Sequence, residues 1–122
     1  MNVYDLPIFK EHFQTYLQLL DELAELLHKQ ENKHKILIEK AYSHIIELFS
    51  QLNAGYNYWG TKGKLQLYNK VRICISQLQV EIFSLFELKL ISQTYESTFE
   101  QSIRYMNGLI RKFEQPVIEN EK

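Results

Sequence analysis

The sequence predicts an all-α protein, an up-down-up-down antiparallel four-helix bundle that forms a single domain over residues 1–122. Apolar residues recur at helical spacings of three and four along four long segments. Only four glycines and two prolines interrupt the chain, and no stretch alternates in apolarity as a strand does. The four helices are expected at about residues 5–29, 34–52, 64–90 and 93–114, with a tail over 115–122.

The first helix is expected to begin at Asp5, a favourable N-cap, with Pro7 in the first turn, where its missing N–H costs nothing. Its apolar stripe consists of Phe9, Phe13, Tyr16, Leu20, Leu23 and Leu27. A polar run from His28 to Lys33 predicts the first turn. The second helix repeats the same spacing with Ile38, Tyr42, Ile45, Phe49 and Leu52.

The segment from Asn53 to Gly63 is expected to be the one long loop. It holds three of the four glycines together with Tyr56, Tyr58 and Trp59, the only tryptophan. Surface loops seldom display so much aromatic area without a use. The alternative is that these rings fold back and plug the end of the bundle.

The third helix is expected to turn one stripe inward, formed by Leu67, Val71, Cys74, Leu78, Ile82 and Leu85. Ser92 is expected to cap the fourth helix, with Glu96 and Glu100 in its first turns, where acids suit the helix dipole. The core stripe of this helix is Phe99, Ile103, Met106, Ile110 and Phe113. Pro116 is expected to end it.

Two helices carry more apolar residues than one stripe requires. Leu19 and Leu26 lie off the stripe of the first helix, and Ile75, Phe83 and Phe86 lie off that of the third. A helix that is apolar on several sides is normally buried. The surplus therefore predicts self-association.

A search for catalytic or metal-binding groups predicts none, and no cofactor. None of the four histidines stands three or four residues from another, and the single cysteine, Cys74, is expected to be buried and inert. The glycines between Gly55 and Gly63 lack the Gly-Lys-Ser/Thr ending of a phosphate loop. Because no signal peptide or membrane span is evident, a cytoplasmic location and no membrane partner are expected.

Charge is unevenly distributed along the chain. The net charge is −1, yet residues 29–72 hold eight Lys and Arg against three acids, and the segments on either side are acidic. An antiparallel bundle would gather seven cations at one end: Lys62, Lys64, Lys70, Arg72, Arg104, Arg111 and Lys112. Together with Tyr56, Tyr58 and Trp59 they suit RNA or single-stranded DNA, through phosphate contacts and base stacking. The alternative is that these charges only solvate helix faces and helix ends.

The segments Leu78–Ser92 and Ile103–Lys112 resemble the last two helices of a bacterial four-helix-bundle superfamily. It includes the rRNA intervening-sequence proteins and the accessory variability (Avd-like) proteins of diversity-generating retroelements. The most specific piece is Arg104-x-Met106–Asn–Gly108–Leu–Ile110, in which Gly108 would allow close helix approach. The layout of the N-terminal half is closer to the accessory variability proteins.

The resemblance implies a non-enzymatic protein of bacterial or phage origin that forms a homopentamer. It would bind a reverse transcriptase and its template RNA or cDNA. Those proteins are markedly basic, whereas this chain has a net charge of −1. Its basic end is therefore expected to contact the RNA or the RNA-bound enzyme. The alternative hypothesis is a four-helix-bundle protein–protein interaction module with no nucleic-acid role, and a metalloenzyme bundle is a third.

Overall fold

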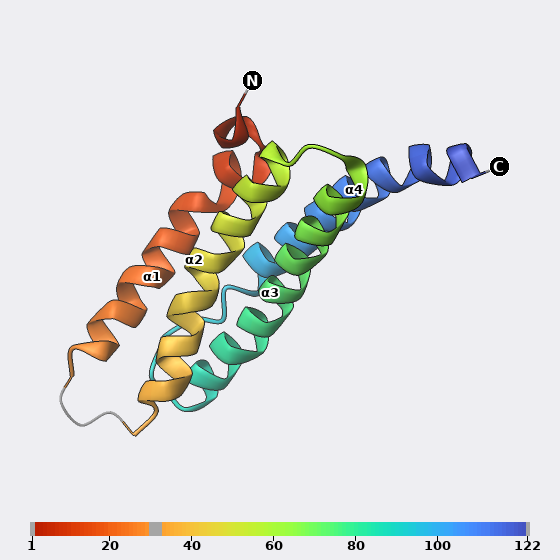
Figure 1. Cartoon of the computed structure of the whole chain (residues 1–122). Helices are drawn as coiled ribbons and strands as arrows, with labels where there is room; N and C mark the ends of the chain where they lie inside the picture. Colours follow the sequence, from red (N-terminus) through yellow and green to blue (C-terminus); the bar gives the residue numbers. More distant parts are fainter. Residues whose placement is uncertain (1, 30–32, 122) are drawn as a thin grey trace.

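The computed structural model describes residues 2–29 and 33–121 of the chain, with side chains as far as Glu114. The elements are, in order, a 3-10 helix η1 (Val3–Asp5), a π-helix η2 (Ile8–His12), and the α-helices α1 (Phe13–Leu27), α2 (Lys35–Asn57), α3 (Thr61–Glu87) and α4 (Glu96–Glu121) (Figure 1). No strand occurs within the described ranges. The predicted all-α four-helix bundle is confirmed.

The four helices run alternately up and down, so one end of the bundle collects the starts of α1 and α3 and the ends of α2 and α4 (Figure 1). The most extensive packing joins α2 to α3. Helix α1 lies against α2, and α4 lies against α3. The amino-terminal helices η1 and η2 sit at the same end as the α2–α3 connection.

Helices α1 and α4 close the bundle through a buried polar contact. The Tyr16 hydroxyl donates a hydrogen bond to Ser102 Oγ at 2.8 Å, and both side chains are buried. The Tyr16 ring also packs against Phe99 and Phe49. Further along, the Tyr95 hydroxyl donates to Glu22. The hydroxyls of Tyr16 and Tyr95 therefore have partners, which removes the cost of leaving them unpaired.

The inward face of α1 is broader than the predicted stripe. Leu19 and Leu26, expected off the stripe, are 1 % and 7 % exposed, whereas Leu20 and Leu27 are only half-buried. Because α1 touches α2 on one side and α4 on the other, a wide arc of the helix is covered. Ile75 of α3 is likewise buried. The surplus of apolar residues is thus smaller than expected, and these three do not support self-association.

The first helix starts differently from the prediction. Asn2, not Asp5, is the N-cap, and it caps the short η1. Asn2 Oδ1 accepts a hydrogen bond from the Tyr4 N–H at 2.9 Å, and Asp5 Oδ2 accepts one from the Asn2 N–H at 2.8 Å. This reciprocal pair is a capping box. The π-helix η2 follows Pro7 before the chain becomes regular at Phe13.

The prediction of a long loop over residues 53–63 is wrong, because only residues 58–60 separate α2 from α3. Gly55 lies within α2, where a Cβ would come 2.8 Å from Cε1 of Tyr68 on α3. This glycine therefore permits a close approach of two helices and does not mark a turn. Gly60 does serve the turn, with a φ of 104° that a residue with a Cβ rarely adopts.

The connection from α3 to α4 also differs from the expectation. Helix α3 ends at Glu87, where Lys89 has a φ of 63° and the Leu90 N–H bonds to the Leu85 carbonyl at 3.0 Å. This is a Schellman ending. Helix α4 begins at Glu96, so Ser92 does not cap it.

Two further predictions about α4 are wrong. The helix continues through Pro116 to Glu121, so the tail expected over 115–122 is helical in its described part. An interior proline removes one backbone donor and usually kinks or breaks a helix, but α4 continues past it. Gly108 does not mediate close packing, since a Cβ there would meet nothing within 4 Å.

Replacing Lys89 with glycine is expected to stabilise the protein. The left-handed backbone costs a residue with a Cβ about 1–2 kcal/mol, so Lys89→Gly should raise the free energy of unfolding by about 0.5–1 kcal/mol after the entropy of glycine is subtracted. Urea denaturation measures this. Lys40→Gly, at an exposed position inside α2, is the matched control and should lower stability by about 1 kcal/mol. Equal losses of stability in both variants would contradict the prediction that the backbone at Lys89 is strained.

Stability is expected to fall at alkaline pH. Burial raises the pKa of four tyrosines: Tyr16, Tyr68, Tyr95 and Tyr105. The pKa of Tyr68 rises from 10.0 to about 12. Because the unfolded chain releases these protons first, their contribution is complete below pH 10 and falls as the pH rises above 10, and the contribution of Tyr68 is lost by about pH 12.

The measurement is urea denaturation between pH 8 and 12, and Tyr68→Phe is the control that should flatten the decline. Burial raises the pKa of Cys74 to about 12, which acts in the same direction. The lowered pKa of Lys64 acts in the opposite direction, because it raises stability as the pH approaches 10.5. A free energy of unfolding that stays constant to pH 12 would contradict the prediction.

Candidate nucleic-acid interface

The α2–α3 connection holds Trp59 out in solvent. Its side chain is 95 % exposed, and its neighbour Tyr58 is 50 % exposed. The connection is only three residues long and turns at Gly60, around which the space is open. The alternative in which these aromatic residues plug the bundle is therefore wrong for Trp59.

Tyr58 is fixed against the start of α3. A Cβ added to Gly63 would lie 2.0 Å from Tyr58 Cε1, so the ring occupies the space left by the missing side chain. The Tyr58 N–H donates to the Gly55 carbonyl at 3.2 Å and ends α2. One part of the ring is thus packed while the rest faces solvent. Gly63 is a packing glycine, a role that composition alone could not distinguish from a turn.

Lys64 ties the end of α2 to the start of α3. Its Nζ donates to the carbonyl oxygens of Gly55 and Tyr56, both at 2.8 Å. It also lies 5.5–5.8 Å from the ring centroids of Tyr56, Tyr68 and Phe113. The last carbonyls of a helix have no partner within the helix and carry partial negative charge, so a cation there is favourable.

This placement decides which role Lys64 can have. Burial lowers the pKa of its ammonium group. The donors of this group are directed at backbone oxygens of the same chain, so we leave Lys64 out of the interface for an external ligand. Tyr56 beside it has its ring in the same cluster.

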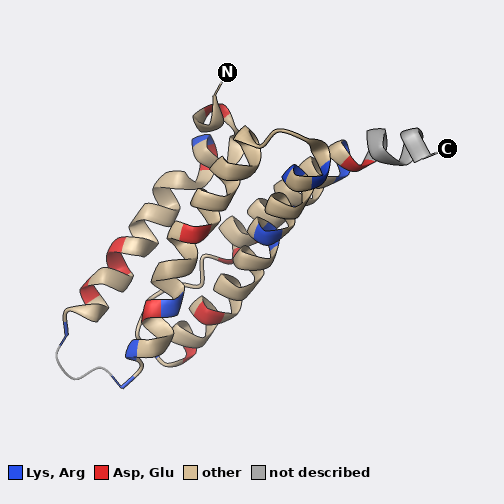
Figure 2. Ribbon diagram, viewed as in Figure 1, with Lys and Arg blue, Asp and Glu red and all other residues tan. Residues whose placement is uncertain are grey.

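The final turns of α4 bring further cations to this end. The Tyr68 and Phe113 ring centroids lie 6.0 Å apart, and Lys112 Nζ lies 6.0 Å from the Phe113 centroid. Arg111 and Lys112 are exposed, as is Lys62 in the first turn of α3. Figure 2 shows basic residues gathered on this part of α3 and α4. These three cations and the rings of Tyr58 and Trp59 form what we call the Trp59 end.

The remaining predicted cations lie along the side of the molecule. Arg72 is partly buried and donates to Asn107 Oδ1 at 3.1 Å and to Asn69 Oδ1 at 2.9 Å, which links α3 to α4. Lys70 and Arg104 are exposed on the same two helices. They extend the basic surface away from the Trp59 end.

Two exposed residues at this end were not predicted from the sequence. Tyr4 is 66 % exposed and packs edge-on against Phe9, and Lys10 is exposed on η2. The start of the chain comes to the same end of the bundle as the α2–α3 connection only after folding. No local pattern in the sequence could have indicated this proximity.

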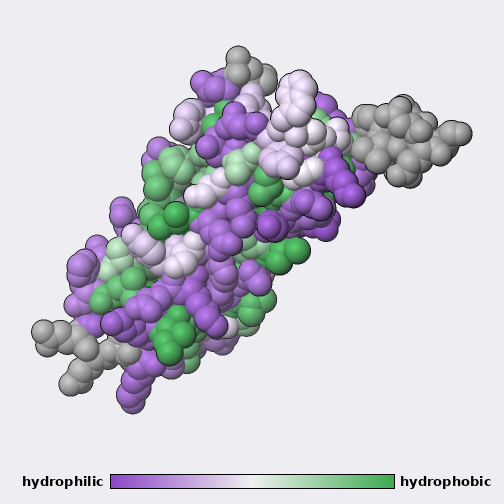
Figure 3. Space-filling model, in the orientation of Figure 1, coloured by the Kyte–Doolittle hydropathy of each residue, from purple (hydrophilic) through white to green (hydrophobic). Residues whose placement is uncertain are grey.

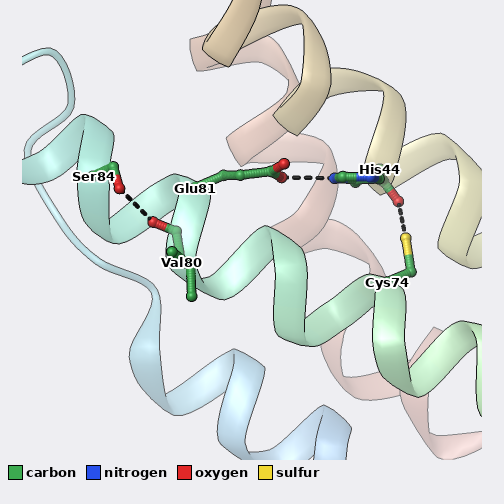
Figure 4. Close-up of polar contacts among 5 residues, drawn as sticks. All are labelled: His44, Cys74, Val80, Glu81 and Ser84. Carbon is green, nitrogen blue, oxygen red and sulfur yellow. Dashed lines mark hydrogen bonds and ion pairs between the residues drawn. The ribbon is translucent and has the colours of Figure 1, made fainter.

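Elsewhere, polar groups between α2 and α3 bridge the two helices (Figure 4). His44 Nδ1 lies 2.7 Å from Glu81 Oε1, and the Cys74 thiol donates to the His44 carbonyl at 3.1 Å. Burial raises the pKa of Cys74 to about 12, which keeps it a thiol at neutral pH and agrees with the expected inert cysteine. Among the described residues, no three His, Cys, Asp or Glu side chains gather as metal ligands would.

No protein family, curated protein or solved structure matched the chain when it was compared with them. In the part of the chain that the structure describes, no helix combines the length and apolarity needed to cross a bilayer. The fold and the site together define a small helical bundle with an aromatic and basic end.

The structural role of Lys64 is tested by Lys64→Met, which keeps the apolar stem and removes the charge. Loss of the two hydrogen bonds to the end of α2 is expected to lower the free energy of unfolding by about 1–2 kcal/mol in urea denaturation. Lys62→Met, two residues away and exposed, is the matched control and should change it by less than about 0.5 kcal/mol. Equal effects of the two variants would show that Lys64 is not a cap.

Proposed function

We propose that this chain is a non-enzymatic accessory protein that binds single-stranded nucleic acid at the Trp59 end. In this role it would work with a reverse transcriptase and its template RNA or cDNA. The observation that carries the nucleic-acid part is the 95 % exposed Trp59 ring at the same end as Lys62, Arg111 and Lys112.

The chemistry of the Trp59 end suits an unpaired strand. An exposed indole offers a flat face on which a base can stack, and such stacking is worth about 1–3 kcal/mol per base. Lysine and arginine beside it can neutralise phosphates and release their counterions. Tyr58, held against Gly63, supplies a second partly exposed ring on a rigid support.

The local charge matters more here than the total. The chain carries a net charge of −1, so it has no general attraction for polyanions. At about 0.15 M salt, charges act over roughly 8 Å, so cations clustered at one end still act on a phosphate held there. Binding is therefore proposed to be confined to this end and to weaken with salt.

The enzyme partner is proposed from the resemblance to accessory variability proteins. That resemblance rests on residues 78–92 and on the Arg104-x-Met106–Asn–Gly108 segment of α4. It also implies a homo-oligomer of five copies. We propose the cytoplasm, where the enzyme and its template would be, as the location of the protein. The enzyme part is tested by asking whether a neighbouring gene encodes a reverse transcriptase. That enzyme should then co-elute with this protein after co-expression.

The nucleic-acid part is tested by fluorescence anisotropy with a labelled single-stranded RNA of about 20 nucleotides at 50 and 200 mM salt. Trp59→Ala is expected to weaken binding by about tenfold, in line with the loss of one stacked base. Arg111→Glu combined with Lys112→Glu is expected to weaken it further and to reduce its salt dependence. Because Trp59 is the only tryptophan, its fluorescence in the unaltered protein should be quenched on binding.

Matched controls lie at the opposite end of the bundle. Ile36→Ala removes an apolar side chain that is 72 % exposed, and Lys35→Glu with Lys40→Glu reverses two exposed cations of α2. None of these should change the affinity. No binding at 50 mM salt, or binding unaffected by Arg111→Glu with Lys112→Glu, would refute the proposal. In that case the protein–protein module becomes the better interpretation.

A further inference from the structure

Helix α3 exposes an apolar seam on the side of the bundle. Three of its side chains face solvent: Ile73 is 54 % exposed, Val80 64 % and Phe83 50 %. They stand seven and three residues apart, which places them on one line along the helix. With the residues between and beyond them, the seam is Asn69, Ile73, Ser76, Val80, Phe83 and Glu87, the a and d spacing of a heptad.

The seam borders a groove against α4. This open groove of about 700 Å³ is lined by Ile73, Ser76 and Val80 from α3 and by Ile103 and Asn107 from α4. Val80 and Phe83 also line a second hollow with Glu96 at the start of α4. Hydrophobic surface appears along this edge of the molecule in Figure 3. The apolar side chains and the hollows beside them offer a surface into which side chains of a partner could pack.

Charge along this face changes sign from one end to the other. Toward the Trp59 end, the exposed charges on α3 and α4 include Lys70, Arg104 and Arg111. Toward the opposite end they are Glu87 and Glu100, with the partly buried Glu96 (Figure 2). Lys89 in the α3–α4 connection and Glu114 near the basic end are the exceptions.

We propose that this face binds a second copy of the chain, with the two α3 helices antiparallel about a two-fold axis. A surface that is basic at one end and acidic at the other is complementary to its own reversed copy. The reversed pairing brings Lys70 of one copy near Glu87 of the other. A parallel pairing would instead place Lys70 against Lys70 and Glu87 against Glu87.

The seam also maps onto itself when it is reversed. With the axis level with Leu78, Ile73 lies opposite Phe83 of the other copy, Ser76 opposite Val80, and Asn69 opposite Glu87. Each a position thus meets a d position, as in an antiparallel coiled coil. The two pairs of large side chains, Ile73 with Phe83, lie on either side of the smaller Ser76 and Val80 pairs at the axis.

This inference concerns assembly and does not depend on the proposed strand binding. The two Trp59 ends would lie at opposite ends of the dimer, and both remain free to bind a strand. A two-fold dimer also differs from the five-copy assembly that the resemblance implies. The mass of the particle distinguishes the two.

The experiment is light scattering during size-exclusion chromatography of the full chain at about 50 µM. Two chains of 14.6 kDa predict a particle of about 29 kDa. Val80→Glu places a charge in the middle of the seam and should give a monomer, with circular dichroism confirming that the helices remain. Ile36→Glu, at an exposed position on α2, is the matched control and should stay dimeric.

The orientation is tested by charge reversal. Lys70→Glu and Glu87→Lys should each raise the dissociation constant by about tenfold, because the two-fold axis repeats each unfavourable pair. The two changes together should restore the original dissociation constant. In a parallel pairing, each single change would replace one like-charged pair by another and should not weaken the dimer. A monomer or a five-copy particle for the unaltered chain would overturn the inference. A dimer unaffected by Val80→Glu, or one that the combined change fails to restore, would do so as well.

Discussion

The corner between α2 and α3 depends on one partly buried cation, Lys64. The Lys64 ammonium group donates hydrogen bonds to the carbonyl oxygens of Gly55 and Tyr56 and lies near three aromatic rings. With these acceptors satisfied, α2 can stop and the chain can reverse within three residues. The extensive α2–α3 packing, with Gly55 against Tyr68, follows from that tight reversal. The same geometry leaves Trp59 no place inside the bundle.

The molecule presents two surfaces of different character. The Trp59 end combines exposed rings with cations, while the α3–α4 side combines an apolar seam with charge that changes sign along its length. Arg72 connects the two regions, since its guanidinium joins Asn69 on α3 to Asn107 on α4. The seam leaves Tyr58 and Trp59 of both copies in the proposed dimer open, and Arg111 is the residue that belongs to both surfaces.

Much of the core could be predicted because helical periodicity follows from burial on one side. On α3, Val71, Leu78 and Leu85 are buried as expected. On α1 the choice between Leu19 and Leu20 could not be made, because adjacent leucines point about 100° apart and both neighbouring directions are apolar. The basic and aromatic composition of the candidate site was visible in the sequence, but the internal role of Lys64 was not. The resemblance to accessory variability proteins remains a prediction.

The sequence by itself determined the all-helical class, the number of long helices and their alternating direction, because these depend on local periodicity and short connections. Only the tertiary structure decided what the glycines and the exposed aromatics do. Gly55 and Gly63 accommodate rings from distant or facing positions, whereas Gly60 makes the turn. Whether a side chain fills a space or faces water depends on how the helices on either side of it pack together. Trp59 is therefore exposed, not a plug, for a reason that no local pattern contains.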